Sequence, residues 1–444
     1  MSERSAVHEI VNALWRALHE LDSKAELNEI ERWGFSIHAA LSAPGREYHN
    51  HDHVVSLIAQ GDALEIIAAL YHDAVYIQVD QDLPRSMKVE LSTAIAPEAG
   101  GWRILPTAAG PVTGDTLAVF GRKVGDYVTP TTGLNELCSA LVAAIQLHGA
   151  LTREQTIAIS ACIEQTIPFR RDPVTPLRER LVLLGLDGDT LTAAMKRAVR
   201  LGNRDVENFC DNDAARFLDN TWKLLPESNP ALHDPQLYTV RDYRAALQKM
   251  ETFLGTLPAE RVFHTFADEP RPETHARRVA RTTGNLELAV RYLRAKLYSI
   301  SVVEAIAEVT GGDVPLDYFM GGNKHPGGTA GMLRIEQFLP TLAPAADLDP
   351  ALHKLLAEGR ASESSFDTGP SPLGAFLHAT VGEAEVMKGV EQARRWWGGA
   401  MDAAQFLVGQ PSKPTAAIAR AAANIIDTRR DRLFALGERL ERGI

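Results

Sequence analysis

Tyr48-His49-Asn50-His51-Asp52-His53 is a histidine-rich turn, and Tyr71-His72-Asp73 follows it along the chain. Apolar residues recur with helical spacing between the two segments, and Gly61-Asp62 interrupts them. This pattern predicts two short helices, with His53 at the start of the first and His72-Asp73 at the end of the second. If these helices are antiparallel, the two ends meet, and side chains nineteen positions apart can surround one ion.

The side chains in these segments suit a divalent metal. Imidazole nitrogens and carboxylate oxygens are ligands for Zn, Mn, Fe or Mg, and the region contains no cysteine thiolate. Neighbouring residues inside a helix point about 100° apart, so His72 and Asp73 cannot share one helix face. A helix end removes this restriction. The sequence therefore predicts a metal site to which His53, His72 and Asp73 contribute.

The same residues resemble a known family. Tyr48-His49-Asn50 with His53, and His72-Asp73 with Ala74-Val75-Tyr76, look like the HD-domain superfamily of metal-dependent phosphohydrolases. That family has a helical fold and a signature of His, then His-Asp, then a distant Asp. The Tyr-His-Asn spelling is similar in particular to cyclic-nucleotide phosphodiesterases and to small bacterial HD phosphohydrolases. The match covers about 30 residues.

The resemblance implies a role for each matching residue. His49 corresponds to the general acid that protonates the leaving oxygen, and His53 to the first metal ligand. His72 and Asp73 correspond to the second and third ligands, and Asp73 would also act in catalysis by bridging to a second ion. The distant aspartate is expected on a helix over 191–209. Asp205 is the best-placed candidate there, and its competitors are Asp211, Asp213 and Asp219.

This ligand set predicts an enzyme. A divalent metal, as one ion or two, would lower the pKa of a bound water so that it attacks phosphorus, while His49 donates a proton. We therefore expect a metal-dependent phosphohydrolase, a phosphodiesterase acting on a small nucleotide-type phosphoester. Two alternatives stay open. The same ligands with extra His or Glu can hold a di-iron pair of an oxygenase, or the core can be a non-catalytic nucleotide sensor or scaffold.

Further contacts to a second metal or to phosphate are expected outside the motif. Glu164 lies on an otherwise apolar face of a helix over 153–166, where a carboxylate needs a partner. It is a candidate second-metal ligand, or it forms an ion pair with Arg170 or Arg171. These arginines are alternatively suited to hold a substrate phosphate, since guanidinium binds phosphate in bidentate fashion. Lys88 is a weaker candidate for a phosphate contact.

Composition narrows the class of protein. With 45% apolar and 23% charged residues, the chain of 444 residues is typical of globular proteins. A net charge of −11 disfavours a stable nucleic-acid partner. No run of eighteen apolar residues occurs, so we expect no membrane contact and a cytoplasmic protein. Cys138, Cys162 and Cys210 are far apart and are expected to be reduced.

Helical patterning predicts a mainly all-α protein. The expected regions are an HD phosphohydrolase domain over 1–232, a helical domain over 233–340 and a C-terminal helical region over 341–444. An irregular or β insertion is expected at about 98–128, where Leu117-Ala118-Val119-Phe120 is β-prone. The middle region contains a helical pair over 277–306, interrupted at Thr283-Gly284, and glycine-rich loops at 310–313 and 321–328. The C-terminal helices are expected to pack on the parent domain or on a second copy of the chain.

Overall fold

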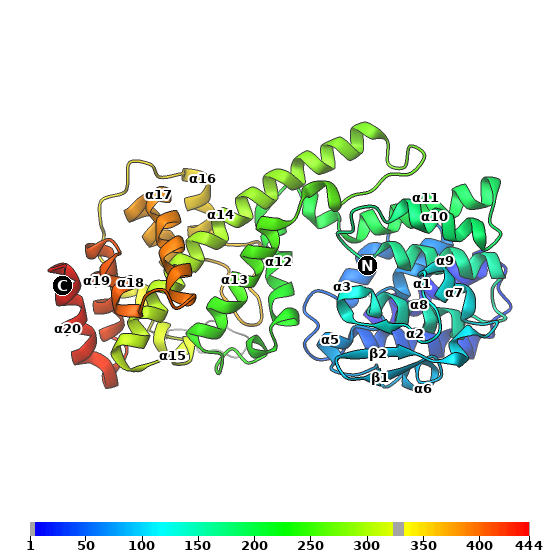
Figure 1. Ribbon diagram of the computed structural model, residues 1–444, viewed down its shortest axis with the longest axis horizontal. Helices are drawn as coiled ribbons and strands as arrows, with labels where there is room; N and C mark the ends of the chain where they lie inside the picture. Colours follow the sequence, from blue (N-terminus) through cyan, green and yellow to red (C-terminus); the bar gives the residue numbers. More distant parts are fainter. Residues whose placement is uncertain (1–4, 323–332, 444) are drawn as a thin grey trace. The chain divides into compact units, whose positions relative to one another are not determined.

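The computed structural model describes residues 5–322 and 333–443. Helices account for 66% of the structure and strands for 4%, which confirms a mainly all-α protein (Figure 1). The chain divides into two compact units. Unit 1 contains Met1–Cys210 and Pro258–Thr283, and unit 2 contains Asp211–Leu257 and Gly284–Ile444. Each unit is built from two stretches of chain, whereas the sequence analysis expects three consecutive regions.

Helix α14 (Pro272–Gly311) explains this difference. It is one continuous helix of 40 residues, so the expected break at Thr283-Gly284 is wrong. A glycine inside a helix costs only about 1 kcal/mol relative to alanine, which favourable packing readily offsets. The first part of α14 belongs to unit 1 and the rest to unit 2, so the division between the units falls inside a helix.

Unit 1 is a bundle of helices around α4. Its helices are α1 (Ala6–Glu20), α2 (Leu27–Leu41), α3 (His51–Ile58), α4 (Ala63–Tyr71), α5 (Ile77–Asp80), α6 (Lys88–Leu91), α7 (Gly114–Val119), α8 (Leu134–Gln146), α9 (Arg153–Gln165), α10 (Val174–Leu183) and α11 (Gly188–Asp205). Every residue of α4 except Ile66 is buried. α4 contacts α1, α3, α8, α9 and α11. A helix that is apolar on all sides belongs in the centre of a bundle, and here it carries His72-Asp73 at its end.

A small antiparallel sheet lies in the region expected to form an insertion. Its strands are β1 (Ile95–Glu98), β2 (Gly101–Ile104) and β3 (Tyr127–Val128), in the order β1-β2-β3. The register pairs Ile95 with Ile104 and Trp102 with Val128. The β-prone run at 117–120 is not a strand but the end of α7, because Leu117 and Val119 are buried where α7 packs on α8 and α9. Packing thus overrides β propensity at this position.

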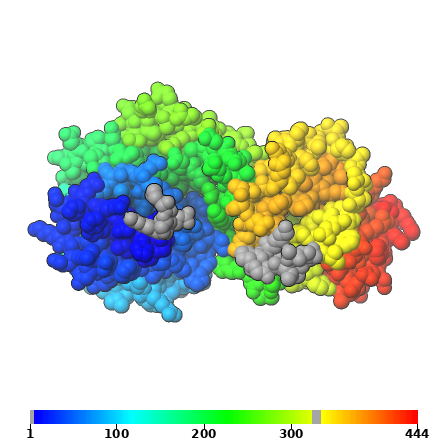
Figure 2. Space-filling view, turned by 180° about the vertical axis from the view of Figure 1, so that it is seen from behind, coloured from blue at the N-terminus to red at the C-terminus, as the bar shows by residue number. Residues whose placement is uncertain are grey.

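Unit 2 is also helical. Its helices are α12 (Ala214–Ser228), α13 (Val240–Thr256), the larger part of α14, α15 (Leu316–Met320), α16 (Pro350–Glu358), α17 (Pro372–Trp397), α18 (Ala403–Val408), α19 (Ser412–Ala423) and α20 (Arg430–Glu441). α17 has a kink at Gly382, whose φ is 82°. α19 and α20 pack on each other at the end of the chain, red in Figure 2. Among the described residues, no helix combines the length and apolar character needed to cross a bilayer.

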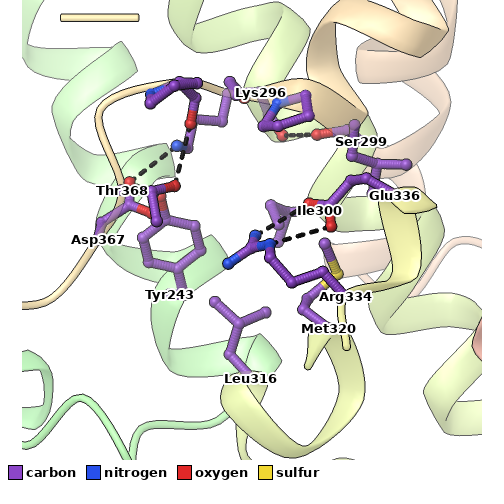
Figure 3. A pocket seen from close by; sticks show the side chains of 14 residues that line it. Tyr243, Lys296, Ser299, Ile300, Leu316, Met320, Arg334, Glu336, Asp367 and Thr368 are labelled. Atoms are coloured by element: carbon purple, nitrogen blue, oxygen red, sulfur yellow. Dashed lines mark hydrogen bonds and ion pairs between the residues drawn. The ribbon is translucent and has the colours of Figure 1, made fainter. Parts of the chain in front are cut away.

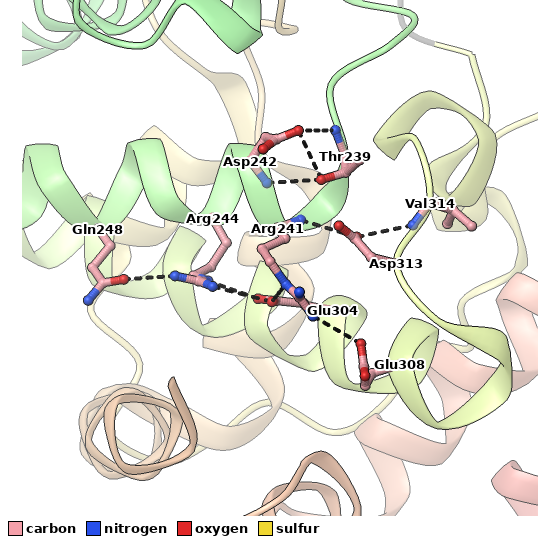
Figure 4. A network of polar contacts seen from close by, with 9 residues as sticks. All are labelled: Thr239, Arg241, Asp242, Arg244, Gln248, Glu304, Glu308, Asp313 and Val314. Atoms are coloured by element: carbon pink, nitrogen blue, oxygen red, sulfur yellow. Dashed lines mark hydrogen bonds and ion pairs between the residues drawn. The ribbon is translucent and has the colours of Figure 1, made fainter. Parts of the chain in front are cut away.

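Ion pairs join α13 to α14 within unit 2. The carboxylate of Glu304, buried on α14, accepts hydrogen bonds from Arg241 (3.2 Å) and Arg244 (2.9 Å) of α13 (Figure 4). Thr239 and Asp242 form a capping box that starts α13 beside this network. Of the two expected glycine-rich loops, 310–313 begins at the end of α14, whereas residues 323–328 of the second lie outside the described residues.

Candidate metal centre

The two histidine segments lie at helix ends, as the sequence predicts. Asn50 precedes α3, and its side chain accepts hydrogen bonds from the backbone amides of Asp52 (2.9 Å) and His53 (3.3 Å). This cap fixes the first turn of α3, which carries His53. His72 follows α4 directly, and Asp73 is the next residue, so both side chains leave the end of the most buried helix of unit 1.

Four side chains meet between these helix ends and the end of α11. The Nε2 atom of His53 lies 2.9 Å from Oδ1 of Asp205 and 3.7 Å from Oδ2 of Asp73. The Nε2 atom of His72 lies 2.9 Å from Oδ2 of Asp73 and 3.4 Å from Oδ1 of Asp205. Ligand atoms of His53, His72 and Asp73 all lie within 4.8 Å of one another, as expected for side chains that can hold one ion.

Asp205 is the aspartate that reaches this cluster, and its competitors serve elsewhere. Asp213 caps α12 by accepting a hydrogen bond from the amide of Ala215, and Asp211 accepts one from the amide of Asp213. Asp219 accepts a hydrogen bond of 2.7 Å from the hydroxyl of Ser362. All three belong to unit 2, whereas Asp205 ends α11 in unit 1.

His72 presents a nitrogen that needs a cation. Its Nδ1 atom donates a hydrogen bond to the carbonyl of Ala69 (2.8 Å), because a carbonyl oxygen only accepts. In the neutral ring, Nε2 therefore carries a lone pair. The Nε2 atom of His72 and Oδ2 of Asp73 are buried and, although close, form no hydrogen bond. A lone pair facing a carboxylate is repulsive unless a proton or a metal ion lies between them, and a backbone bond at Nδ1 is typical of metal-binding histidines.

The pKa values describe the same balance of charge. Burial by itself lowers the pKa of His72, but the carboxylates of Asp73 and Asp205 outweigh burial and raise this pKa well above its ordinary value. Burial by itself raises the pKa of both carboxyls, but the neighbouring imidazoles outweigh it. They hold the pKa of Asp73 far below its ordinary range and lower the pKa of Asp205 to about 2. The cluster thus favours two carboxylates with a cation between them.

His49 lies beside the cluster rather than in it. Its ring centroid is 6.1 Å from that of His53, and its ring makes edge contacts with Tyr76 (4.5 Å) and Tyr48 (4.9 Å). The two tyrosines therefore hold the imidazole at the edge of the centre. His51, on the same turn, faces Asp52, and its side chain is 38% exposed.

Arg46 is a positioning residue that the sequence analysis did not assign to the site. Its guanidinium forms two hydrogen bonds with the carboxylate of Asp80 (2.9 and 2.6 Å). The remaining Nη1 atom donates to the carbonyl of Asp73 (2.6 Å) and to that of His49 (3.4 Å). One buried arginine thus joins the backbone of both histidine segments. No local pattern around Arg46 points to this role, because its partners lie up to 34 positions away.

Glu136 is a second residue that the sequence analysis missed. It lies in the first turn of α8, where an acidic residue ordinarily stabilises the helix dipole. Its Oε2 atom is buried without a hydrogen-bond partner. Burial, followed by the negative charges of Asp73 and Asp205, raises the pKa of Glu136 to about 7. Its carboxyl therefore belongs to the electrostatic environment of the candidate metal centre.

Replacing Glu136 by Gln is expected to change how stability depends on pH. Between pH 4.5 and about 7 the folded protein holds a proton on Glu136 that the unfolded chain has lost. Stability of the metal-free protein therefore falls through this range as pH rises, by roughly 3 kcal/mol. Glu136→Gln lacks this loss and should be the more stable protein at about pH 8, but not at about pH 4. Urea unfolding with a chelator at both pH values measures the difference.

Glu154→Gln is the matched control for that experiment. Glu154 occupies the first turn of α9, as Glu136 does that of α8, but its side chain is exposed. The control should retain the pH profile of the parent protein. An unchanged profile in Glu136→Gln would contradict the raised pKa.

Glu164 is an ion-pair partner in this structure, and Arg170 is one of the two arginines expected from the sequence for that role. The carboxylate is 2% exposed and accepts from Arg170 (2.6 Å) and Arg180 (2.7 Å) at Oε1. Its Oε2 atom accepts from Gln165 (2.8 Å) and again from Arg170 (3.1 Å). Both oxygens are therefore occupied. Lys88 pairs with Asp82, and both side chains are about half exposed.

Glu164→Gln is expected to reduce stability without changing metal content. The variant removes the charge that two arginines share, and these arginines are partly exposed, at 27% and 22%. Because water can solvate them, we expect a loss of about 1–3 kcal/mol rather than the larger cost of isolating a buried charge. Thermal unfolding and elemental analysis check both parts. Loss of bound metal in this variant would restore Glu164 as a ligand.

Comparison with known proteins adds no further assignment. Protein-family models, curated proteins and solved structures give no match to this chain. The resemblance to the HD-domain superfamily therefore stays a prediction that depends on the two histidine segments and Asp205.

Proposed function

We propose that this protein is a metal-dependent phosphohydrolase, and specifically a phosphodiesterase that acts on a small nucleotide-type phosphoester. The observation that carries the proposal is the convergence of His53, His72, Asp73 and Asp205. Nε2 of His72 and Oδ2 of Asp73 are left without hydrogen bonds at its centre. Buried polar atoms without partners are costly, and a divalent cation bound by these four side chains would remove that cost.

The donor set fits the metals predicted from the sequence. Two imidazoles and two carboxylates suit Zn, Mn or Fe, and the carboxylates alone suit Mg. When bound, such an ion supplies Lewis acidity, which activates water and neutralises charge on phosphoryl oxygens. The second-ion role of Asp73 is part of this proposal, and burial followed by the charges of Asp73 and Asp205 raises the pKa of Glu136, so this carboxyl lies within their electrostatic range.

The surrounding residues suit acid catalysis at the edge of the site. His49 is partly exposed and held by Tyr48 and Tyr76 beside the cluster, so its imidazole is placed to approach a substrate bound there. A histidine there can donate a proton to the leaving oxygen. Esters with a poor leaving group, such as the alkoxide that leaves from a nucleotide diester, benefit most from this step, which is compatible with a phosphodiesterase.

The decisive experiment measures metal content and hydrolysis in the same preparations. Elemental analysis of the purified protein is paired with assays on cyclic nucleotides, dinucleotides and a generic phosphodiester, with each candidate metal added in turn. We expect bound divalent metal and phosphoester hydrolysis that a chelator abolishes. Iron with oxygen consumption and no phosphoester hydrolysis would favour the di-iron oxygenase. No bound metal in metal-rich buffer would favour the sensor.

His49→Gln is expected to lower turnover by about 10²–10⁴-fold while leaving metal content unchanged. Its imidazole lies beside the ligands and not among them, so the variant should lose proton donation alone. His51→Gln is the matched control, because His51 lies on the same turn with an exposed side chain. Equal turnover in the two variants, or loss of metal from His49→Gln, would show that His49 is not the acid.

A further inference from the structure

Unit 2 contains a second polar site, which shares no residue with the metal centre. A cavity of about 40 Å³ is bordered by α13, α14 and α15 and by the segments that precede α16 and α17 (Figure 3). Its polar lining includes Lys296 from α14, Tyr243 from α13, Asp367 and Ser371. The space exceeds that of one water molecule and suits a group of a few heavy atoms.

Lys296 is a buried cation at the wall of this cavity. The residue is 4% exposed, and its Nζ atom donates to Oδ2 of Asp367 (2.8 Å). The same nitrogen lies 5.1 Å from the ring centre of Trp222 and 5.6 Å from that of Tyr243. Burial lowers the pKa of Lys296 to about 8, because Asp367 only partly compensates and Arg360 opposes it. The negative charge near Lys296 is therefore too small to compensate for burial of the ammonium group.

The single negative charge of Asp367 does not balance the two positive charges beside it. Its Oδ2 atom also accepts hydrogen bonds from Trp222 (2.8 Å) and Tyr243 (2.6 Å), so one oxygen already has three donors. Arg360, whose side chain is fully buried, places Nη1 3.6 Å from this oxygen. Two cations thus share one carboxylate.

Arg360 also has donors without acceptors. Its Nη2 atom donates to the carbonyl of Thr368 (2.8 Å), but Nε and Nη1 are buried without hydrogen-bond partners. The neighbouring Arg334 forms its own ion pair with Glu336 (3.0 Å), so that pair contributes no net charge. Lys296 and Arg360 therefore lie beside a single carboxylate, that of Asp367, in a buried setting, which is unfavourable unless an anion completes the cluster.

The start of α17 faces the same cavity. Ser371, Pro372 and Leu373 line it, and Ser371 caps the helix without a side-chain hydrogen bond. The first amides of a helix and its dipole both favour a negative group at this end. Proline at the first position has no amide hydrogen, so only the amides that follow it can donate at this end.

We propose that this cavity binds a small anion of the phosphate or carboxylate class. Lys296 contacts the anion directly, the first turn of α17 donates to it, and Arg360 supplies the second positive charge behind Asp367. The ligand is a free anion or the phosphoryl or carboxylate end of a larger metabolite, since both present the same group to these donors. The site gives unit 2 a ligand of its own, whatever reaction unit 1 performs.

The first test uses inorganic phosphate and acetate as probes on the full chain. A chelator removes metal beforehand, so that phosphate does not bind at the metal centre. Calorimetric titration of the parent protein is compared with Lys296→Met, and Lys354→Met is the matched control because the Lys354 side chain is 70% exposed. We expect phosphate or acetate affinity to fall at least about tenfold in Lys296→Met and to stay unchanged in Lys354→Met. Equal affinity in all three proteins overturns the proposal.

A second measurement needs no variant and so does not depend on folding. An amine-selective reagent is added to the metal-free parent protein with and without phosphate or acetate, and the modified lysines are located by mass spectrometry. Either anion should slow modification of Lys296 while leaving that of Lys354 unchanged. Protection by phosphate alone assigns a phosphoryl ligand, and protection by both anions assigns a general anion site. Absence of protection by either anion overturns the proposal.

Discussion

His72→Ala is expected to abolish bound metal and phosphoester hydrolysis together. The imidazole is 1% exposed, its Nδ1 proton is held by the backbone at Ala69, and Nε2 faces two carboxylates. Loss of an outer partner of a ligand costs about 10–100-fold in metal affinity, so loss of the ligand itself should cost more. Elemental analysis and the phosphodiester assay measure the two effects. Asp73→Ala should behave in the same way.

The control for this prediction is a variant that disturbs the same bundle without touching the centre. Glu164→Gln serves, because Glu164 is equally buried in unit 1 but is surrounded by arginines. Circular dichroism must show both variants folded. Retained turnover in folded His72→Ala would exclude the proposed metal centre.

Acid should weaken metal binding in the parent protein. Burial lowers the pKa of His72, but the carboxylates of Asp73 and Asp205 outweigh burial and raise this pKa well above its ordinary value. A proton therefore competes with the metal for Nε2. This competition is strongest at low pH. It is a second test of the tautomer in which Nδ1 of His72 donates to the carbonyl of Ala69 and Nε2 is the atom that binds the metal.

Asp367→Asn is expected to destabilise unit 2 by about 3–5 kcal/mol, the typical cost of leaving a buried charge without its partner. Asn retains an oxygen for Trp222 and Tyr243 but leaves Lys296 and Arg360 with no negative charge. Burial alone raises the pKa of Asp367, and Lys296 and Arg360 lower it further than burial raises it. The stability from this lowered pKa is present above pH 3.8 and is lost as pH falls through the folded-state pKa.

Calorimetric unfolding near neutral pH measures this loss. The difference between variant and parent should shrink in acid. Asp427→Asn is the matched control, because Asp427 pairs with Arg430 on the surface and its side chain is 81% exposed. An exposed pair is worth at most about 1 kcal/mol. Equal unfolding of Asp367→Asn and the parent would show that the charge cluster does not stabilise unit 2.

Local features of this protein follow from its sequence. The helical spacing on either side of Gly61-Asp62 gives α3 and α4, Asn50 caps α3, and His72-Asp73 falls at the end of α4. These features depend on contacts between residues three or four positions apart, which a sequence displays directly. The mainly helical class and the candidate ligands His53, His72 and Asp73 were therefore predictable from order and spacing alone.

Tertiary packing decided the features that join distant residues. Asp205 reaches His53 across 152 positions, and Arg46 reaches Asp80 across 34. The sequence leaves two roles open for Glu164, a metal ligand or an ion-pair partner, and only the fold brings Arg180 beside it. Lys296 and Asp367 are 71 positions apart and meet only in the folded unit. Periodicity shows which face of a helix is buried but not which residues cover it, so charge balance and metal geometry appear only once the helices are packed.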